Sequence, residues 1–177
     1  MRRREPGKGG FTLIELIIVI VIIGVLSAIA APQYVRTMEN SKAEMGATLL
    51  KRVAHANLIY NTDRYAYLGG AITNACVTET TCPAATAVCS LVTCGYLAKQ
   101  NFDKEPYVVF AGTYNGSTYT CGDAGIAGMT GIACARRRTT GTGGTSKSPY
   151  TGWGYNVDKN AVATANPSSG GPPPPTQ

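Results

Sequence analysis

The sequence predicts an α+β protein: one long N-terminal helix, membrane-spanning in its first half, with a small disulfide-stapled antiparallel sheet packed on its second half. Three observations predict this class. An apolar run begins at residue 11, and a helical repeat of apolar residues follows it. After both come six cysteines and strand-like segments separated by turn residues. With 177 residues, the chain is long enough for one modest domain with its own core once the apolar run is set aside.

The apolar run covers residues 11–31 and follows the basic residues Arg2, Arg3, Arg4 and Lys8. Its roughly 21 residues, at about 1.5 Å per helical residue, span about 30 Å, which is the thickness of the hydrocarbon core of a bilayer. Positive charge in front of an apolar span keeps that end in the cytoplasm. We therefore expect the leader in the cytoplasm and the rest of the chain on the far side of the membrane.

One carboxylate, Glu15, lies inside this run. Burial of a lone acid near the centre of a membrane helix costs about 2.5–3.5 kcal/mol, so an ionisable group at this depth is by default a functional hypothesis. The partner that Glu15 lacks is a positive charge.

The residues Gly10-Phe11-Thr12-Leu13-Ile14-Glu15-Leu16, placed directly after a basic leader, resemble the N-terminus of type IV pilins and of the pseudopilins of type II secretion. The resemblance covers about the first third of the chain. It implies cleavage between Gly10 and Phe11 by a prepilin peptidase that also N-methylates Phe11. It carries the essential glutamate of the family onto Glu15, and a glycine and a proline that loosen the helix onto Gly24 and Pro32.

The same resemblance implies a homo-oligomeric helical filament, built by an assembly machinery in the bacterial inner membrane. If cleavage creates a cationic amine at Phe11, Glu15 lies about 6 Å further along the helix axis, where it meets that amine or that of a neighbouring copy. A buried carboxylate that gains an amine only at the correct stagger penalises every other register. Glu15 is thus expected to set the register of assembly, and N-methylation leaves the charge of the amine in place.

The helical pattern continues beyond Pro32, where the missing N–H predicts a bend. The charged residues occupy helix positions outside the apolar repeat. Gly69-Gly70 is expected to end the helix. The repeat consists of Met38, Met45, Leu49, Val53, Ala56 and Tyr60, and the charged positions are Glu39, Lys42, Lys51 and Arg52.

The cysteines lie in the exported part of the chain, where disulfides persist, and their even number predicts that all are paired. They lack any C-x-x-C spacing and the single histidine, His55, is remote, so no metal site is expected. Many connectivities are open from sequence alone. A nearest-neighbour guess pairs Cys76 with Cys82, Cys89 with Cys94, and Cys121 with Cys134. The last loop resembles the disulfide loop near the C-terminus of many pilins.

The body between the helix and the tail shows weaker patterns. A stapled connecting region is expected over residues 71–100, with a short helix over 90–99. Asn115-Gly116 predicts a hairpin turn between strands at 107–110 and 117–120, and a further strand fits 153–157. The Gly- and Thr-rich stretch 139–148 is expected to be a flexible loop, and the end of the chain, which includes four consecutive prolines, an extended tail. The expected divisions are the leader 1–10, the spanning helix 11–31, the extended helix with the head 32–165, and the tail 166–177.

No convergent set of catalytic groups is visible, because the chain has one histidine and scattered acids and lacks a phosphate-binding glycine motif. We therefore expect neither an enzyme nor a cofactor. The net charge of +6 is partly that of the leader, which weakens the case for a polyanionic partner. The run Arg136-Arg137-Arg138 is interpreted as solvated charge, with contact to DNA phosphates or an acidic neighbour as the alternative. Asn115-Gly116-Ser117 fits a glycosylation sequon but is already explained by the turn.

Together these features predict a structural subunit of a type IV pilus-like filament, or fimbrium. The alternative within the family is a type II secretion pseudopilin, which has a role in protein secretion rather than adhesion. An alternative of another class is a soluble, disulfide-rich secreted binding protein, whose signal peptide is removed after Ala28-Ile29-Ala30 and whose mature form begins at Ala31. We expect the subunit in the inner membrane before assembly, and in a surface pilus or a periplasmic pseudopilus afterwards.

Overall fold

The structure is a computed structural model that describes residues 10–83, 87–121, 129–141, 143, 149–165 and 172. The chain divides into two compact units, residues 1–38 and residues 39–177. Except for Gly10 and Pro172, the predicted leader and the predicted tail from residue 166 onward lie outside the described residues, and so does most of the predicted loop 139–148 beyond Gly141.

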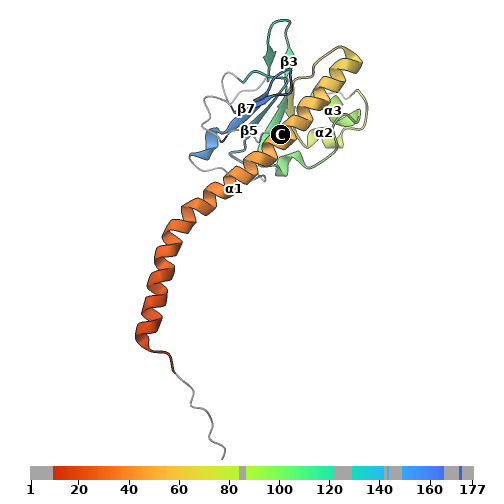
Figure 1. The fold of residues 1–177 in the computed structure, drawn as a ribbon. Coiled ribbons are helices and arrows are strands. Elements are labelled where there is room, and N and C mark those ends of the chain that lie inside the picture. Colours follow the sequence, from red (N-terminus) through yellow and green to blue (C-terminus); the bar gives the residue numbers. More distant parts are fainter. Residues whose placement is uncertain are drawn as a thin grey trace, which may run out of the picture. The chain divides into compact units, whose positions relative to one another are not determined.

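The helix α1 (Leu13–Arg64) contains 52 residues and is unbroken at Gly24 and at Pro32 (Figure 1). In the first unit every residue from Phe11 to Met38 is exposed. An 18-residue window of this helix has a mean hydropathy of 3.0, which makes α1 long and apolar enough to cross a membrane. The predicted apolar helix is therefore confirmed.

The helix ends at Arg64, five residues before the predicted stop at Gly69-Gly70. Tyr65 follows with φ of 56°, in the left-handed region. A residue in this conformation turns the chain away from the helix axis, and its N–H still donates to the Asn61 carbonyl at 2.8 Å. The glycine pair lies beyond this turn, and Gly70 already begins the first strand.

The second unit contains a five-stranded antiparallel sheet in the order β1-β2-β5-β6-β7. Residues 39–64 of α1 cover one face of it (Figure 1). The core between them includes Leu50, Val53, Tyr107 and Tyr155, all almost fully buried. The strands are β1 (Gly70–Ile72), β2 (Tyr107–Ala111), β5 (Ala133–Arg137), β6 (Gly154–Val157) and β7 (Ala163–Ala165). The predicted α+β class, with an antiparallel sheet on the second half of the helix, is confirmed.

The predicted turn at Asn115-Gly116 is confirmed, but the predicted partner strands were partly wrong. The turn joins two short strands of a separate hairpin, β3 (Thr113–Tyr114) and β4 (Tyr119–Thr120). The strand at 107–110 instead pairs with β1 and β5 in the main sheet. Its apolar residues are buried by pairing with segments distant in sequence, which a local turn signal does not reveal.

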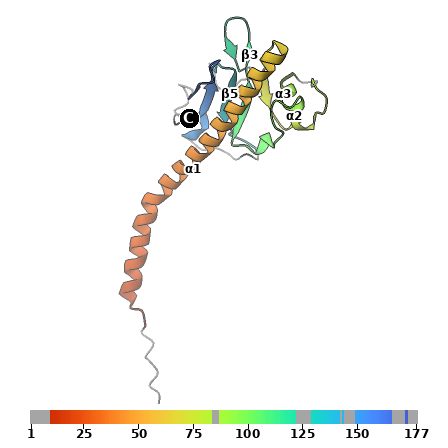
Figure 2. The same ribbon diagram turned by 45° about the vertical axis from the view of Figure 1, so that its right-hand side comes forward.

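Two of the three guessed disulfide pairs were wrong. The structure joins Cys76 to Cys89 and Cys82 to Cys94, and the guessed Cys121–Cys134 bond is present. The short helices α2 (Ala75–Thr78), η1 (Ala87–Cys89) and α3 (Ser90–Thr93) pack together on one side of α1 (Figure 2). Because these segments lie side by side, each cysteine faces one on the other segment rather than its neighbour in sequence. Of the helix predicted over residues 90–99, the structure contains only the four residues of α3. Two further 3₁₀ helices are η2 (Phe102–Lys104) and η3 (Tyr150–Gly152).

Candidate functional site

Glu15 takes part in a hydrogen-bonded box that begins α1. The carboxylate accepts from the Thr12 backbone N–H at 3.0 Å and from the Thr12 hydroxyl at 2.8 Å. In return, the Thr12 hydroxyl oxygen accepts from the Glu15 N–H at 3.3 Å. This reciprocal pattern is a capping box, which satisfies donors that the first turn of a helix leaves without partners. Thr12 was missed from sequence, although the Thr-x-x-Glu spacing in front of an apolar run could have revealed it.

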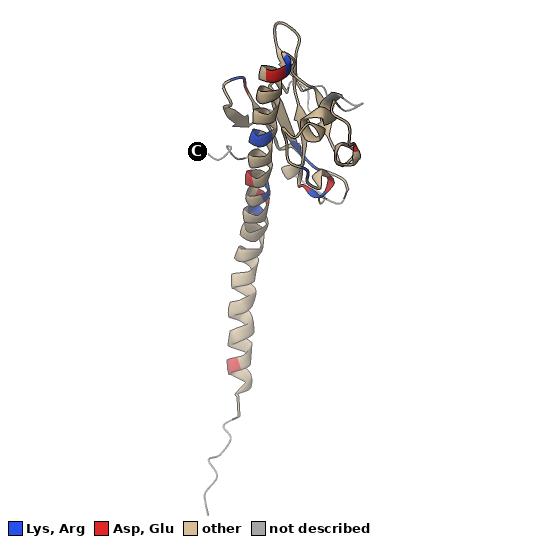
Figure 3. Ribbon diagram, turned by 90° about the vertical axis from the view of Figure 1, so that its right-hand side faces the viewer, with Lys and Arg blue, Asp and Glu red and all other residues tan. Residues whose placement is uncertain are grey.

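The capping box gives Glu15 hydrogen bonds but no opposite charge. Residues 11–35 contain no Lys or Arg, and the lower part of α1 in Figure 3, around its red segment, is without blue. Both salt bridges found among the described residues involve Glu39, not Glu15. Within the described part of one chain, Glu15 therefore has no cationic partner.

The other sequence-predicted processing and assembly residues lie in the same unit. Gly10, Phe11, Gly24 and Pro32 are all exposed, and Phe11 has 89% of its surface accessible. A side chain at Gly10 or at Gly24 would meet nothing within 4 Å. The fold of a single chain therefore places no demand for glycine at these two positions, and reasons for it have to be sought in processing or assembly.

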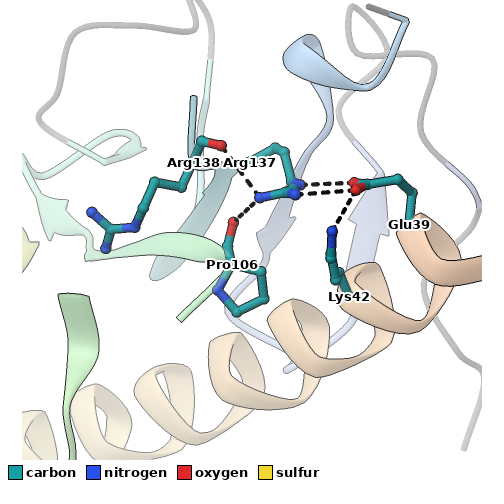
Figure 4. Close-up of polar contacts among 5 residues, drawn as sticks. All are labelled: Glu39, Lys42, Pro106, Arg137 and Arg138. Carbon is teal, nitrogen blue, oxygen red and sulfur yellow. Dashed lines mark hydrogen bonds and ion pairs between the residues drawn. The ribbon is translucent and has the colours of Figure 1, made fainter. Parts of the chain in front are cut away.

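A second glutamate on the same helix, Glu39, is buried and paired. Arg137 on β5 donates from Nε to one Glu39 oxygen at 2.9 Å and from an NH2 group to the other at 3.2 Å (Figure 4). Lys42, one turn along α1, donates to the same carboxylate at 2.7 Å. Two parallel hydrogen bonds between guanidinium and carboxylate are among the strongest pairings that proteins use. They fasten β5 to the helix at the first residue of the second unit.

The Arg137 side chain is fully buried, with 0% of its surface exposed. Its remaining NH1 group donates to the Pro106 carbonyl at 2.7 Å and to the Arg138 carbonyl at 3.2 Å (Figure 4). The guanidinium carbon also lies 5.8 Å from the centre of the Tyr107 ring. A buried charge is tolerated when it is paired and its donors are satisfied, and Arg137 meets both conditions.

Burial alone would raise the pKa of Glu39. The hydrogen bonds from Arg137 and Lys42, together with their positive charges, outweigh burial and hold the pKa below its ordinary value. Glu39 is therefore ionised at neutral pH, as the paired geometry requires.

The prediction that Arg136-Arg137-Arg138 forms a solvated charge run was wrong. Successive side chains of a strand point to opposite faces, so Arg137 points away from the face of its neighbour Arg136. Arg137 faces α1, whereas Arg136 lies over the Phe110 ring at 6.0 Å. Arg138 donates to the carbonyls of Glu105 and Phe102 at 3.1 and 3.0 Å. The run therefore does not present three parallel guanidinium groups to a phosphate backbone.

The prediction of which residues of the helix are buried was also partly wrong. Leu49, Val53, Ala56 and Tyr60 are buried as predicted, but Met38 and Met45 are 43% and 54% exposed. Glu39, assigned to the polar side, is 7% exposed. A buried ion pair has the same composition as a solvated one, so the sequence pattern could not distinguish them.

Asn57 is a buried polar residue that the sequence analysis missed, next to an exposed His55. Its side-chain NH2 donates to the carbonyls of Leu68, Gly112 and Ile132 at 3.0–3.1 Å, and its oxygen accepts from the Leu68 N–H at 2.9 Å. One side chain thus satisfies backbone groups from three segments where they meet the helix. An asparagine inside a helix carries no sequence signal of such a role.

The comparisons with known proteins match parts of the chain. Residues 6–31 match the model of the prokaryotic N-terminal methylation motif. The chain is 37% identical over 67 residues to the type II secretion system core protein G of Pseudomonas aeruginosa, a match that covers 38% of this chain and 46% of that protein. It is 43% identical over 65 residues to the type IV major pilin protein PilA of Myxococcus xanthus, which covers 36% of this chain and 30% of that protein.

The chain thus spans less than half the length of each of these relatives. It carries the methylation motif over residues 6–31 and is similar to both a type IV major pilin and a core protein of type II secretion, in agreement with the resemblance stated from the sequence. These matches do not separate the two. Both relatives carry the names of structural components rather than of enzymes, which agrees with the expectation that the chain is not an enzyme.

Proposed function

We propose that this chain is the structural subunit of a type IV pilus-like filament. In this proposal the chain is cleaved between Gly10 and Phe11, N-methylated at Phe11, and polymerised through the apolar helix of residues 11–31. The methylation motif over residues 6–31 and the similarity to a type IV major pilin support it.

The observation that carries the proposal is an apolar stretch, residues 11–31, that holds a single acid and is not covered by any of the described residues of its own chain. The large side chains from Leu13 to Ile29 are 45–78% exposed. Full burial of one such side chain is worth about 1.5–3 kcal/mol, so a stretch of this length strongly favours transfer out of water. A bilayer supplies that environment to the single subunit, and the helices of other copies supply it in a filament.

Glu15 then decides how the copies align. In the bilayer, Thr12 provides hydrogen bonds to the carboxylate but not a positive charge. Cleavage after Gly10 would create a cationic amine at Phe11, and a neighbouring copy at the correct axial stagger would bring this amine to Glu15. Every other stagger leaves a charge buried without its partner, which is the costly arrangement.

The location follows from the same features. Related proteins of the pilin and pseudopilin family are anchored in the inner membrane by the N-terminal apolar helix before assembly, and α1 is a candidate span. The basic leader places the N-terminus in the cytoplasm and the body beyond the membrane. Three disulfides in the body fit an oxidising compartment. The expected partners are a prepilin peptidase, the assembly machinery and further copies of the chain.

A pseudopilin of type II secretion is the second candidate. It is favoured by the 37% identity to a type II secretion core protein. A pseudopilin shares the cleavage, the methylated Phe11 and the register role of Glu15, and differs in where the filament ends. A soluble secreted binder is the candidate of another class, and it predicts a mature chain beginning at Ala31.

The test is mass spectrometry of material sheared from the cell surface. The proposal predicts an N-terminal peptide that begins with monomethylated Phe11 and sediments with filaments. A methylated Phe11 peptide found only in the periplasmic and membrane fractions would favour the pseudopilin. A peptide beginning at Ala31 in the cell-free medium would contradict both filament candidates.

A further inference from the structure

Charges of alternating sign follow one ridge on the surface of α1. Residues four positions apart on a helix form such a ridge. One ridge carries Arg36, Asn40, Glu44, Thr48 and Arg52, all exposed except the half-buried Asn40. Its charged residues recur every eight positions, in the order plus, minus, plus. We call these five residues the charged ridge.

Within the described part of the chain, no side chain of opposite sign pairs with the charged ridge. Both salt bridges found there belong to Glu39. Eight positions on a helix correspond to about 12 Å along the axis, at about 1.5 Å per residue. Because side chains on a helix meet at separations of three or four positions, Glu44 does not reach Arg52 of its own chain. Both charges are therefore open to solvent or to another molecule.

A second copy of α1 complements the charged ridge when it is displaced by eight positions along the helix axis. Its Arg36 then comes level with Glu44 of the first copy, and its Glu44 comes level with Arg52. The same displacement brings His55 level with Asp63, and both of these residues are exposed. Opposite charges that come level attract each other, whereas like charges repel. The displacement therefore aligns three pairs that each consist of an acid and a base.

Other displacements are less favourable for the charged residues of α1 from Arg36 onward. A displacement by six positions brings Arg36 level with Lys42. Displacements by nine and by ten bring Lys42 level with Lys51 and with Arg52. Each of these arrangements places like charges opposite each other, and no other displacement of up to fourteen positions aligns as many acid–base pairs as eight does. The charges therefore favour one register between two copies and penalise several others.

A contact of this kind builds a ring or a filament. Glu44 and Arg52 point in directions about 80° apart around the helix, because 3.6 residues complete a turn. Two copies joined through these residues therefore use different faces, and each outer copy keeps one of the two faces free for the next. A contact between different faces repeats from copy to copy and does not close as a twofold dimer. Met45, which is 54% exposed next to Glu44, adds an adaptable apolar side chain beside the ridge.

From these observations we propose that the charged ridge binds α1 of a second copy that is displaced by eight positions, about 12 Å, along the helix axis. The inference rests on the proposed function, in which every copy enters one membrane in the same orientation, so that the α1 helices run parallel. It adds a second register contact, beyond the apolar stretch, to the one proposed at Glu15. The Phe11 amine lies only four positions from Glu15, so the two contacts join a subunit to different neighbours, which a helical filament provides at several heights.

Chemical cross-linking of sheared filaments tests the displacement. Arg52→Lys keeps the positive charge and introduces an amine. A water-soluble carbodiimide activates the Glu44 carboxylate, the amine attacks the activated carbonyl carbon, an amide bond forms, and the carbodiimide leaves as its urea. We expect a dimer band on a denaturing gel, whose joined peptides connect position 44 of one copy to position 52 of another. A dimer in which Glu44 is joined to Lys51 alone, or to neither position, would overturn the proposed displacement.

Charge reversal tests the same contact without a reagent. Arg52→Glu places two carboxylates level, so we expect the filament yield to fall about threefold to tenfold. The melting temperature should not change, because the Arg52 side chain is exposed. The triple variant Arg36→Glu, Glu44→Arg and Arg52→Glu restores the alternation with every sign inverted, and its yield should recover. Lys99→Glu reverses an exposed charge outside α1 and should leave the yield unchanged. Quantitative blotting of sheared filaments against the membrane fraction gives the yields.

The outcomes separate this contact from the proposed function. Filaments of normal yield from Arg52→Glu, or a triple variant as defective as Arg52→Glu, would overturn the contact and leave the proposed function standing. If the unmodified chain gives no filaments with methylated Phe11, the proposed function is contradicted and the contact falls with it.

Discussion

Glu15 and Glu39 lie on the same helix and have opposite surroundings. Glu39 finds Arg137 and Lys42 within its own chain and is buried with them. Among the described residues Glu15 finds only Thr12, in a stretch where every residue is exposed. A glutamate whose counter-charge is supplied by its own fold stabilises that fold. For the glutamate in the apolar stretch, the proposed function places the partner on another copy of the chain.

The regions around the two glutamates differ in the same way. Residues 39–177 pack half of the helix against a sheet and bury residues such as Leu50 and Tyr155 completely or nearly so. The first unit leaves its Ile and Val side chains about half exposed. One region makes its own core, and the other, in the proposed function, is covered by a bilayer or by further copies. The following experiments test this contrast, from the largest expected effect to the smallest.

The largest effect is expected from Glu15→Ala. The variant should still insert in the membrane and lose its leader, because neither step uses the carboxylate. Loss of one partner of a buried ion pair costs about 3–5 kcal/mol, which corresponds to more than about 100-fold in the equilibrium constant for adding a subunit. Quantitative blotting of sheared filaments against the membrane fraction measures it. Filaments of normal yield from Glu15→Ala would contradict the register role.

Arg137→Met should destabilise the body without affecting the leader or the span. The substitution leaves the buried Glu39 carboxylate with Lys42 as its remaining donor and takes from the Pro106 carbonyl one of its two donors, the other being the Arg138 N–H. Loss of the buried partner costs about 3–5 kcal/mol. The double variant Glu39→Leu with Arg137→Met removes both charges and should recover most of that loss. Urea unfolding, followed by the fluorescence of Trp153, gives the free energies. If the double variant loses as much unfolding free energy as the two single variants together, the ion pair is not the cause of the loss in Arg137→Met.

The pH dependence of stability should identify Glu39 directly. Its pKa is lowered in the folded chain, so the unfolded chain binds a proton first as the pH falls. The contribution of ionised Glu39 to the free energy of unfolding is therefore fully present above the ordinary glutamate pKa of about 4.3 and is lost as the pH falls below it. Glu39→Gln should be less stable at neutral pH but lose less on acidification from pH 7 to pH 3.5. Parallel pH profiles for the two proteins would argue against the assignment.

Lys42→Ala should have the smallest effect. The Lys42 side chain is 33% exposed, and an ion pair open to solvent contributes about 0–0.5 kcal/mol. Addition of 1 M salt should remove most of this contribution but little of that of Arg137. A loss from Lys42→Ala as large as that from Arg137→Met would mean that the charge balance around Glu39, and not the buried bidentate pair, holds β5 to the helix.

The sequence predicted the parts of the fold that depend on local patterns. The apolar run, with the basic leader before it and the acid at position 15, predicted the long apolar helix of the first unit. Asn115-Gly116 predicted the hairpin turn. These signals are short in sequence and are therefore readable without long-range information. The position of the helix end was missed because it depends on one left-handed residue, Tyr65, of a type that rarely adopts that conformation.

The features that the sequence did not predict depend on pairings between distant segments. Arg137 contacts Glu39 across 98 positions of the chain, and Asn57 reaches Ile132 across 75. The strand β5 has the sequence Ala-Cys-Ala-Arg-Arg. It therefore lacks the alternation of large apolar and polar residues by which strands are recognised. The pairing of Cys76 with Cys89 likewise follows from how three short helices pack, not from spacing.

The most direct test of the central claim is a cryo-electron microscopy map of the sheared filament at a resolution that shows side chains. The account predicts the Glu15 carboxylate within about 4 Å of the methylated Phe11 amine of a neighbouring subunit, the range of a salt bridge. A filament in which Glu15 keeps only Thr12 as its partner, with every Phe11 amine of other subunits beyond the range of a salt bridge, would contradict it.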